Sequence, residues 1–140
     1  MLKNIYNQKI TILNKLNRVD SLTGLDVWYK TVIDDAAWYK SVERGVTTTS
    51  VVISPFIKVE IPFHDNFLPY DEWKQNGMQV GNYTMSANDY IVLGEVEEDI
   101  NAQNVVATMK KYGENVCTVK FHKELYNRFN ANVQIYVEGV

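Results

Sequence analysis

The chain contains few of the residues on which catalysis and covalent cross-linking depend. Its 140 residues include one cysteine, Cys117, and two histidines, His64 and His122. A single cysteine excludes a disulfide within the chain, which suits a reducing compartment. Most catalytic sites use histidine, cysteine or clustered acids, so this scarcity predicts a protein that is not an enzyme.

Motifs for nucleotides, membranes and nucleic acids are also missing. The chain has no GxGxxG, GxxxxGKS/T or GxSxG pattern. No apolar run is long enough to span a bilayer, and residues 1–7 lack the apolar core of a signal peptide. The net charge of −3 at pH 7 does not supply the basic face that nucleic-acid binding requires. We therefore expect a soluble, cytosolic protein with no cofactor, no metal ion and no membrane association.

The residues that are present favour a β-rich globular fold. Hydrophobic residues make up 46 % and aromatic residues 12 % of the sequence, and aromatic side chains favour strands and interfaces. A length of 140 residues suits one domain, 1–140, that is large enough to bury a hydrophobic core.

Alternation of apolar and polar residues predicts about seven short strands. In residues 57–63, for example, isoleucine, valine and phenylalanine alternate with lysine and glutamate. Pro55 and Pro62 lack a donor N–H, so they should lie at an edge, a bulge or a strand end. Such alternation fits antiparallel sheets with one solvated face, and we expect a small β-barrel or sandwich. The predicted strands are residues 8–14, 26–33, 36–42, 51–63, 90–96, 115–122 and 132–138.

One helix is predicted within about residues 99–112. Apolar residues recur there at helical spacing, acidic residues precede the first turn, and Lys110 and Lys111 fall in the last. Gly113 is placed to cap the end. We expect this helix to pack against the sheet.

The acidic clusters and one small polar stretch are interpreted as connections. Asp34 and Asp35 separate the second predicted strand from the third, and Glu97–Asp99 ends a strand before the helix. A solvated turn and a helix N-terminus are sufficient explanations for the two clusters. The threonine-rich stretch 43–50 is either a flexible loop or a ragged edge strand.

The histidines and the cysteine do not combine into an obvious site. His64 is followed by Asp65, but neighbours on an extended chain point in opposite directions. His122 and Cys117 are five residues apart on one predicted strand, and this odd offset places them on opposite faces.

Cys117 is instead predicted to be a buried core residue. It alternates with Val119 and Phe121 on an apolar face. We expect this thiol to be unreactive.

Residues 64–89 are predicted to form a long loop that binds other molecules. The segment has turn-forming residues and no sustained period, although a short helix over 71–74 shortens it. Long loops run over the surface, and exposed apolar groups gathered in one place mark a binding face. Alternatively, the loop folds back and covers one end of its own barrel. The candidate contact residues are Phe67, Leu68, Tyr70 and Trp73.

The order of several segments carries a family resemblance. They are Ile10–Asn14, Val27–Ile33, a second tryptophan at Trp38, the threonine-rich stretch, Val59–Phe63, and Asn88–Gly94 followed by a helix and two closing strands. This order resembles a family of small phage and prophage structural proteins from Gram-positive hosts. Its members look like proteins of the head–tail connector, or neck, of tailed bacteriophages.

The resemblance implies a structural subunit of the connector, either a head-completion stopper or a neck ring protein. Such a subunit assembles with itself into a ring and joins neighbouring connector and tail proteins. It resides in the virion, and in the cytoplasm of the bacterial host during assembly, and its contact with DNA in a channel is passive.

A competing hypothesis is a monomeric ligand-binding β-barrel, or a small hydrolase that uses His64 and a nearby acid. A binding barrel should have a closed apolar pocket, whereas a ring subunit should present a flat or protruding apolar surface.

Overall fold

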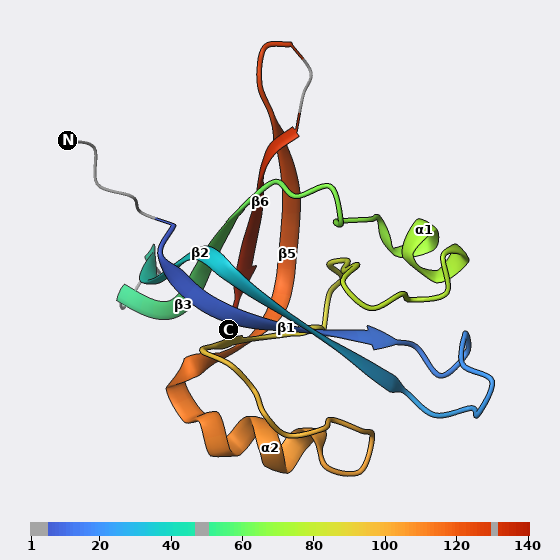
Figure 1. The fold of residues 1–140 in the computed structure, drawn as a ribbon. Helices are drawn as coiled ribbons and strands as arrows, with labels where there is room; N and C mark the ends of the chain where they lie inside the picture. Colours follow the sequence, from blue (N-terminus) through green and yellow to red (C-terminus); the bar gives the residue numbers. More distant parts are fainter. Residues whose placement is uncertain (1–5, 47–50, 130–131) are drawn as a thin grey trace.

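The computed structural model describes residues 6–46, 51–129 and 132–140, in which six antiparallel strands close into a barrel (Figure 1). The strand order is β1-β2-β3-β6-β5-β4, and β4 pairs back to β1. The predicted mainly β architecture is confirmed, in its barrel form. The strands are β1 (Gln8–Leu16), β2 (Val27–Val46), β3 (Val51–Pro62), β4 (Tyr90–Leu93), β5 (Val116–Tyr126) and β6 (Asn132–Gly139).

The predicted break at Asp34 and Asp35 is wrong, because β2 runs through it as one strand. Ile33 is opposite Ile10 on β1, whereas Ala36 is opposite Gln8. Across this interval β2 advances by three residues and β1 by two, which is a β-bulge. The acidic pair therefore marks a bulge within one strand, and the described residues form six strands instead of seven.

β5 extends beyond the predicted 115–122 and contains a second bulge. Its register with β6 shifts between Val119 and Phe121. Cys117 and Val119 are fully buried as predicted, but the shift leaves Phe121 on the outside, 48 % exposed. Burial raises the pKa of the Cys117 thiol to about 12, which agrees with an unreactive core cysteine.

The helices are α1 (Tyr70–Gln75) and α2 (Val105–Tyr112), and a 3-10 turn, η1 (Gly113–Asn115), follows α2. The predicted helix within 99–112 is confirmed, but it begins late. Asn101 and Asn104 hold the preceding turn, because their side-chain oxygens accept backbone N–H groups of this segment. Among the described residues, no helix combines the length and the apolar composition needed to cross a membrane.

Both faces of β1 are buried. On the inner face, Ile10 and Ile12 join the main core of the barrel. On the outer face, Leu13 belongs to a second cluster with Val105 and Met109 of α2. The helix therefore covers the barrel wall at β1 and β4, below the barrel in Figure 1.

The threonine-rich stretch 43–50 is only partly described. Its first four residues belong to β2, and residues 47–50 lie outside the described residues. Pro55 lies in the part of β3 that has no β6 partner, and Pro62 is the last residue of β3, as the prolines predicted.

The segment between β3 and β4 folds back onto its own barrel. Trp73 is fully buried and packs edge-on against Tyr29, with ring centroids 5.3 Å apart. Phe67 is 6 % exposed and packs against the buried ring of Tyr83 at 5.5 Å. Two arrangements were considered for residues 64–89. Phe67 and Trp73 lie as in the second, in which the loop folds back and covers one end of its own barrel.

Buried hydrogen bonds fix this segment to β1. The Asn14 side chain donates to the backbone oxygen of Thr84 (2.7 Å) and to the Asp89 carboxylate (2.9 Å). The backbone N–H groups of Lys15 and Ser86 donate to the same carboxylate, each at 3.0 Å. Asp89 is 1 % exposed, so its negative charge is stabilised by these donors and not by water.

We predict that Trp73→Ala destabilises the fold strongly. Removing a fully buried indole leaves a cavity, and we expect the free energy of unfolding to fall by about 3–5 kcal/mol. Urea unfolding followed by tryptophan fluorescence and circular dichroism measures the change. Val80→Ser is the control in the same segment, because Val80 is fully exposed. Equal stability of the two variants would show that the segment does not belong to the core.

We also predict a stability change that depends on Asp89. Burial raises its carboxyl pKa from 3.8 to about 6, despite the three donors that lower it. The folded chain therefore binds more protons than the unfolded chain between about pH 4 and 6, and the unfolding free energy should decrease as pH rises through this window. The decrease should be on the order of 1–3 kcal/mol. Unfolding curves of the wild type and Asp89→Asn across this range should diverge; parallel profiles would refute the assignment.

Candidate functional site

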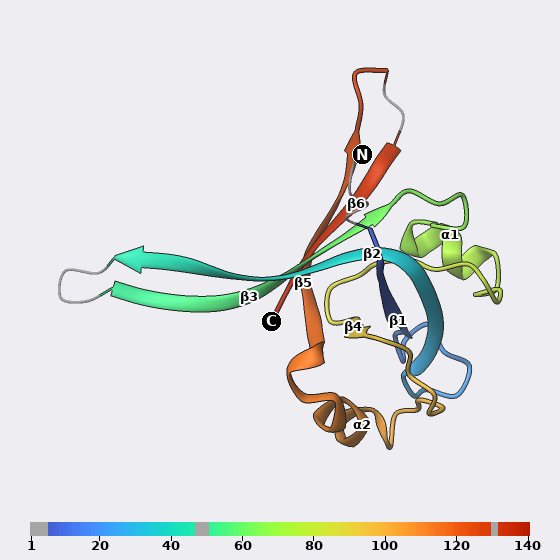
Figure 2. The same ribbon diagram turned by 60° about the vertical axis from the view of Figure 1, so that its left-hand side comes forward.

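Two strands continue past the end of the barrel and form a two-stranded ribbon. The last β3–β6 pair at this end is Ile57 with Gly139, and the last β1–β2 pair is Gln8 with Ala36. Beyond these pairs, β2 and β3 pair only with each other, as far as Val46 and Val51. We call residues 41–46 and 51–56 the β2–β3 arm, which extends far from the barrel in Figure 2.

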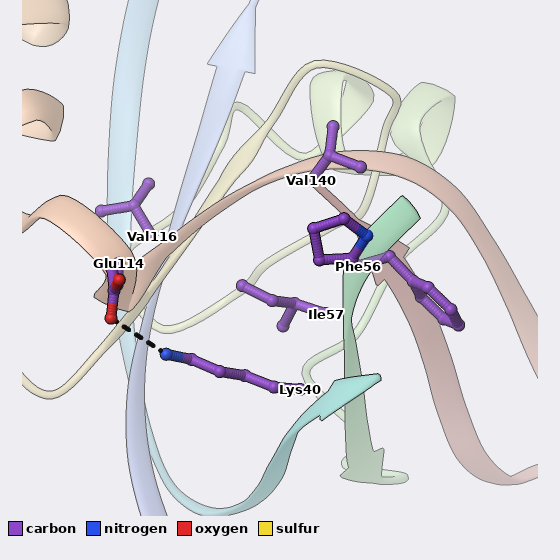
Figure 3. Close-up of a pocket in the computed structure, with 7 residues that line it drawn as sticks. Lys40, Phe56, Ile57, Glu114, Val116 and Val140 are labelled. Carbon is purple, nitrogen blue, oxygen red and sulfur yellow. Dashed lines mark hydrogen bonds and ion pairs between the residues drawn. The ribbon is translucent and has the colours of Figure 1, made fainter. Parts of the chain in front are cut away.

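The apolar inner face of the sheet continues past the end of the barrel, at the root of this arm. We call this continuation the apolar inner stripe. Trp38 and Val59 are paired and buried, and the next pair in the same register, Lys40 and Ile57, lies in an open groove (Figure 3). The residues that line this root groove include Lys40, Pro55, Ile57, Glu114, Val116 and Val140.

One ion pair lies at the rim of the root groove. The Lys40 ammonium is 3.2 Å from the Glu114 carboxylate, and the Glu114 side chain is 89 % exposed. An ion pair this exposed contributes little to stability. The groove thus offers apolar walls and one accessible carboxylate, a combination suited to an apolar side chain accompanied by a cation.

A second hairpin also leaves the barrel. Pro62 with Gln134 is the last β3–β6 pair at the opposite end, and β5 and β6 continue beyond it. We call residues 126–129 and 132–133 the β5–β6 arm, the end of the upright hairpin of Figure 1. Near its tip the Phe129 ring is 75 % exposed, and the Arg128 guanidinium lies 4.8 Å from the centre of that ring.

The four predicted contact residues do not form an exposed patch. Phe67 and Trp73 belong to the barrel's own core, and the expectation that they are exposed is wrong. Leu68 and Tyr70 are half-buried. The Tyr70 hydroxyl donates to Asp20 at 3.0 Å, so it holds α1 against the β1–β2 loop. Turn residues predicted the path of the loop correctly, but not the packing of its aromatic rings.

His64 has an acidic partner, but it is Asp35 and not the neighbouring Asp65. The His64 Nε2 atom is 3.0 Å from the Asp35 carboxylate and Nδ1 is 3.3 Å from the Tyr83 hydroxyl. The carboxylate only accepts, so Nε2 donates to it, and in the neutral imidazole Nδ1 accepts from the Tyr83 hydroxyl. Burial, with Asp35 nearby, raises the pKa of Tyr83. Both ring nitrogens are occupied, and the imidazole satisfies a buried hydroxyl, which is a structural role.

His122 does not lie where its odd offset from Cys117 predicted. The bulge in β5 places His122 opposite Val137, a buried residue of the inner face. His122 is half-buried, and this burial lowers its pKa, against a rise due to Glu124. Within the described residues, no group of three or more histidine, cysteine, aspartate or glutamate side chains is arranged to hold a metal ion.

We predict that His64→Ala lowers stability and leaves assembly intact. The variant strips a buried tyrosine hydroxyl of its partner, which should cost about 1–3 kcal/mol of unfolding free energy. Chemical denaturation and sedimentation velocity measure the two effects, with His64→Gln as the control that keeps a hydrogen-bonding side chain. Lost assembly at unchanged stability would favour a direct functional role for His64.

Comparison with known proteins gives one finding. No curated protein and no solved structure matches the chain. A family model, described as a family of unknown function (DUF6751), matches residues 5–140. That match spans nearly the whole chain, and the protein belongs to this family.

Proposed function

We propose that the protein is a structural subunit that assembles with copies of itself through its two arms. The observation that carries this proposal is the apolar stripe of the sheet, which continues beyond the barrel where nothing in the described part of the chain covers it. Val42 and Val51 on the β2–β3 arm are 54 % and 60 % exposed. Exposed apolar groups gathered on a protruding element are typical of an interface.

The physics of isolated ribbons supports an assembly role. A two-stranded hairpin is marginally stable in water, because each strand has one unpaired edge and no layer packs on it. The β2–β3 arm has this arrangement along residues 41–46 and 51–56. Contact with a neighbouring subunit would supply the missing layer, and each large apolar side chain buried would contribute roughly 1.5–3 kcal/mol.

The kind of assembly is proposed from the family resemblance. A ring subunit of a phage head–tail connector needs a rigid body and protruding elements that reach its neighbours, and a barrel with two arms fits this need. Its partners would be copies of itself and adjacent connector and tail proteins, in the virion. Contact with DNA would remain passive, since the chain carries a net charge of −3.

The competing ligand-binding barrel has less support. Apolar side chains from all six strands pack inside the barrel, among them Ile12, Trp38, Val59, Ile91, Val119 and Ile135. A barrel whose interior is filled in this way is a packed core, whereas a ligand-binding barrel encloses a cavity.

Shortening the β2–β3 arm tests the proposal. Glu43 is opposite Ser54, so residues 44–53 can be replaced by Asn-Gly, which closes a two-residue hairpin at that pair. We expect the melting temperature to change by only a few degrees, because no described core residue is removed, while oligomers seen by light scattering and native mass spectrometry disappear. In phage particles, head–tail joining should fail.

The matched control removes exposed apolar surface elsewhere. Val19 and Leu22 in the β1–β2 loop are 86 % and 106 % exposed, and Val19→Ser with Leu22→Ser should leave assembly unchanged. Oligomers that persist after the arm is shortened, or a wild-type chain that stays monomeric up to millimolar concentration, would contradict the proposed function.

A further inference from the structure

The root groove and the tip of the β5–β6 arm have complementary chemistry. The groove has apolar walls, including Ile57 and Val140, and the exposed Glu114 carboxylate at its rim. The tip has the exposed ring of Phe129 with the cationic Arg128 side chain stacked on it. An aromatic ring with an adjacent cation fits an apolar groove whose rim holds an accessible carboxylate, here Glu114 in its exposed ion pair with Lys40.

One hydrogen bond orders the described residues that lead into the tip. The backbone N–H of Phe129 donates to the Asn127 side-chain oxygen at 2.9 Å, which is a local turn that fixes the direction of the chain. A preformed turn loses less conformational entropy on binding than a flexible loop does. Phe129 is therefore suited to act as an anchor.

A single chain cannot bring its own tip into its own groove. β6 begins beside the tip and ends at Gly139, and the next residue, Val140, lines the groove. A strand of 8 residues spans roughly 26 Å. Figures 1 and 2 both place the tip and the C-terminus at opposite ends of this strand. The contact is therefore available only between two copies.

We propose that Phe129 of one subunit inserts into the root groove of the next, where Arg128 pairs with Glu114 beside the existing Lys40 contact. This inference rests on the proposed function and adds a second contact to it: the tip enters the groove at the root of the β2–β3 arm, while the arm beyond Glu43 supplies the rest of the interface, and assembly requires both. The two surfaces differ, so the interface is heterologous, and repetition of it closes a ring or extends a filament.

Paired variants test this contact. Phe129→Asp removes the anchor from the tip, and Val140→Asp places a charge in the groove at a side chain that is 62 % exposed, where folding is not endangered. Each variant alone should be monomeric in sedimentation velocity experiments. Mixed together, they retain one intact tip and one intact groove, so they should form a one-to-one heterodimer and nothing larger. Val106→Asp on α2 is the control, and it should assemble as the wild type does.

A charge exchange tests the ion pair. Arg128→Glu and Glu114→Arg should each weaken association about tenfold or more, and the two combined in one chain should restore it to within about threefold. Circular dichroism and melting temperature establish that every variant is folded.

The outcomes separate this inference from the proposed function. Normal oligomers formed by folded Phe129→Asp or Val140→Asp, or a mixture that stays monomeric, would overturn the tip-in-groove contact and leave assembly through the arms standing. A wild-type chain that never associates would overturn both. Recovery of oligomers in the charge-exchanged chain supports the contact, and its absence refutes the pairing of Arg128 with Glu114.

Discussion

The Asn14–Asp89 hydrogen bond, at 2.9 Å and buried, is the interaction on which the completed barrel depends. It joins β1 to the end of a segment that leaves the barrel after β3 and returns only at β4. Because Asp89 also accepts from the backbone of Lys15, the returning chain is fixed in register with β1. The aromatic rings of Phe67 and Trp73 then fill the space between this segment and the sheet. A charge with almost no access to water is stable there only while these donors remain in place.

A second constraint is the difference in length between neighbouring strands. β2 has 20 residues and β3 has 12, whereas their other neighbours in the barrel, β1 and β6, have 9 and 8. Short neighbours cannot pair with the whole of a long strand, so the excess of β2 and β3 must leave the barrel as a ribbon. The apolar inner stripe continues onto it, and the root groove is the place where that stripe emerges from the core.

Local patterns in the sequence predicted the secondary structure, because hydrophobic alternation and helix capping act between residues close together in the chain. Alternation identified the strands, and dipole-compatible charges with Gly113 identified α2. The pairing register between distant strands could not be predicted from the sequence. One bulge places Asp34 and Asp35 within a continuous strand, and another turns Phe121 outward. The His64–Asp35 contact joins residues 29 apart and depends on that register. The root groove was missed for the same reason, because its residues come from separate strands and from η1. The apolar residues of β3 on either side of Pro55 were the one signal that could have pointed to it.

The division between a packed body and two thin arms bears on how assembly would proceed. The barrel core, the α2 cluster and the buried Asp89 network are complete within one chain, so the body needs no partner in order to fold. On the described part of the arms the side chains of Val42, Val51 and Phe129 are more than half exposed, and these are the groups that a neighbour would bury. Association would then involve the entropic cost of fixing a few arm residues, and not the cost of folding a subunit. Affinity in such an arrangement depends on a few anchoring side chains, and a ring of many weak, identical contacts gains its stability from closure.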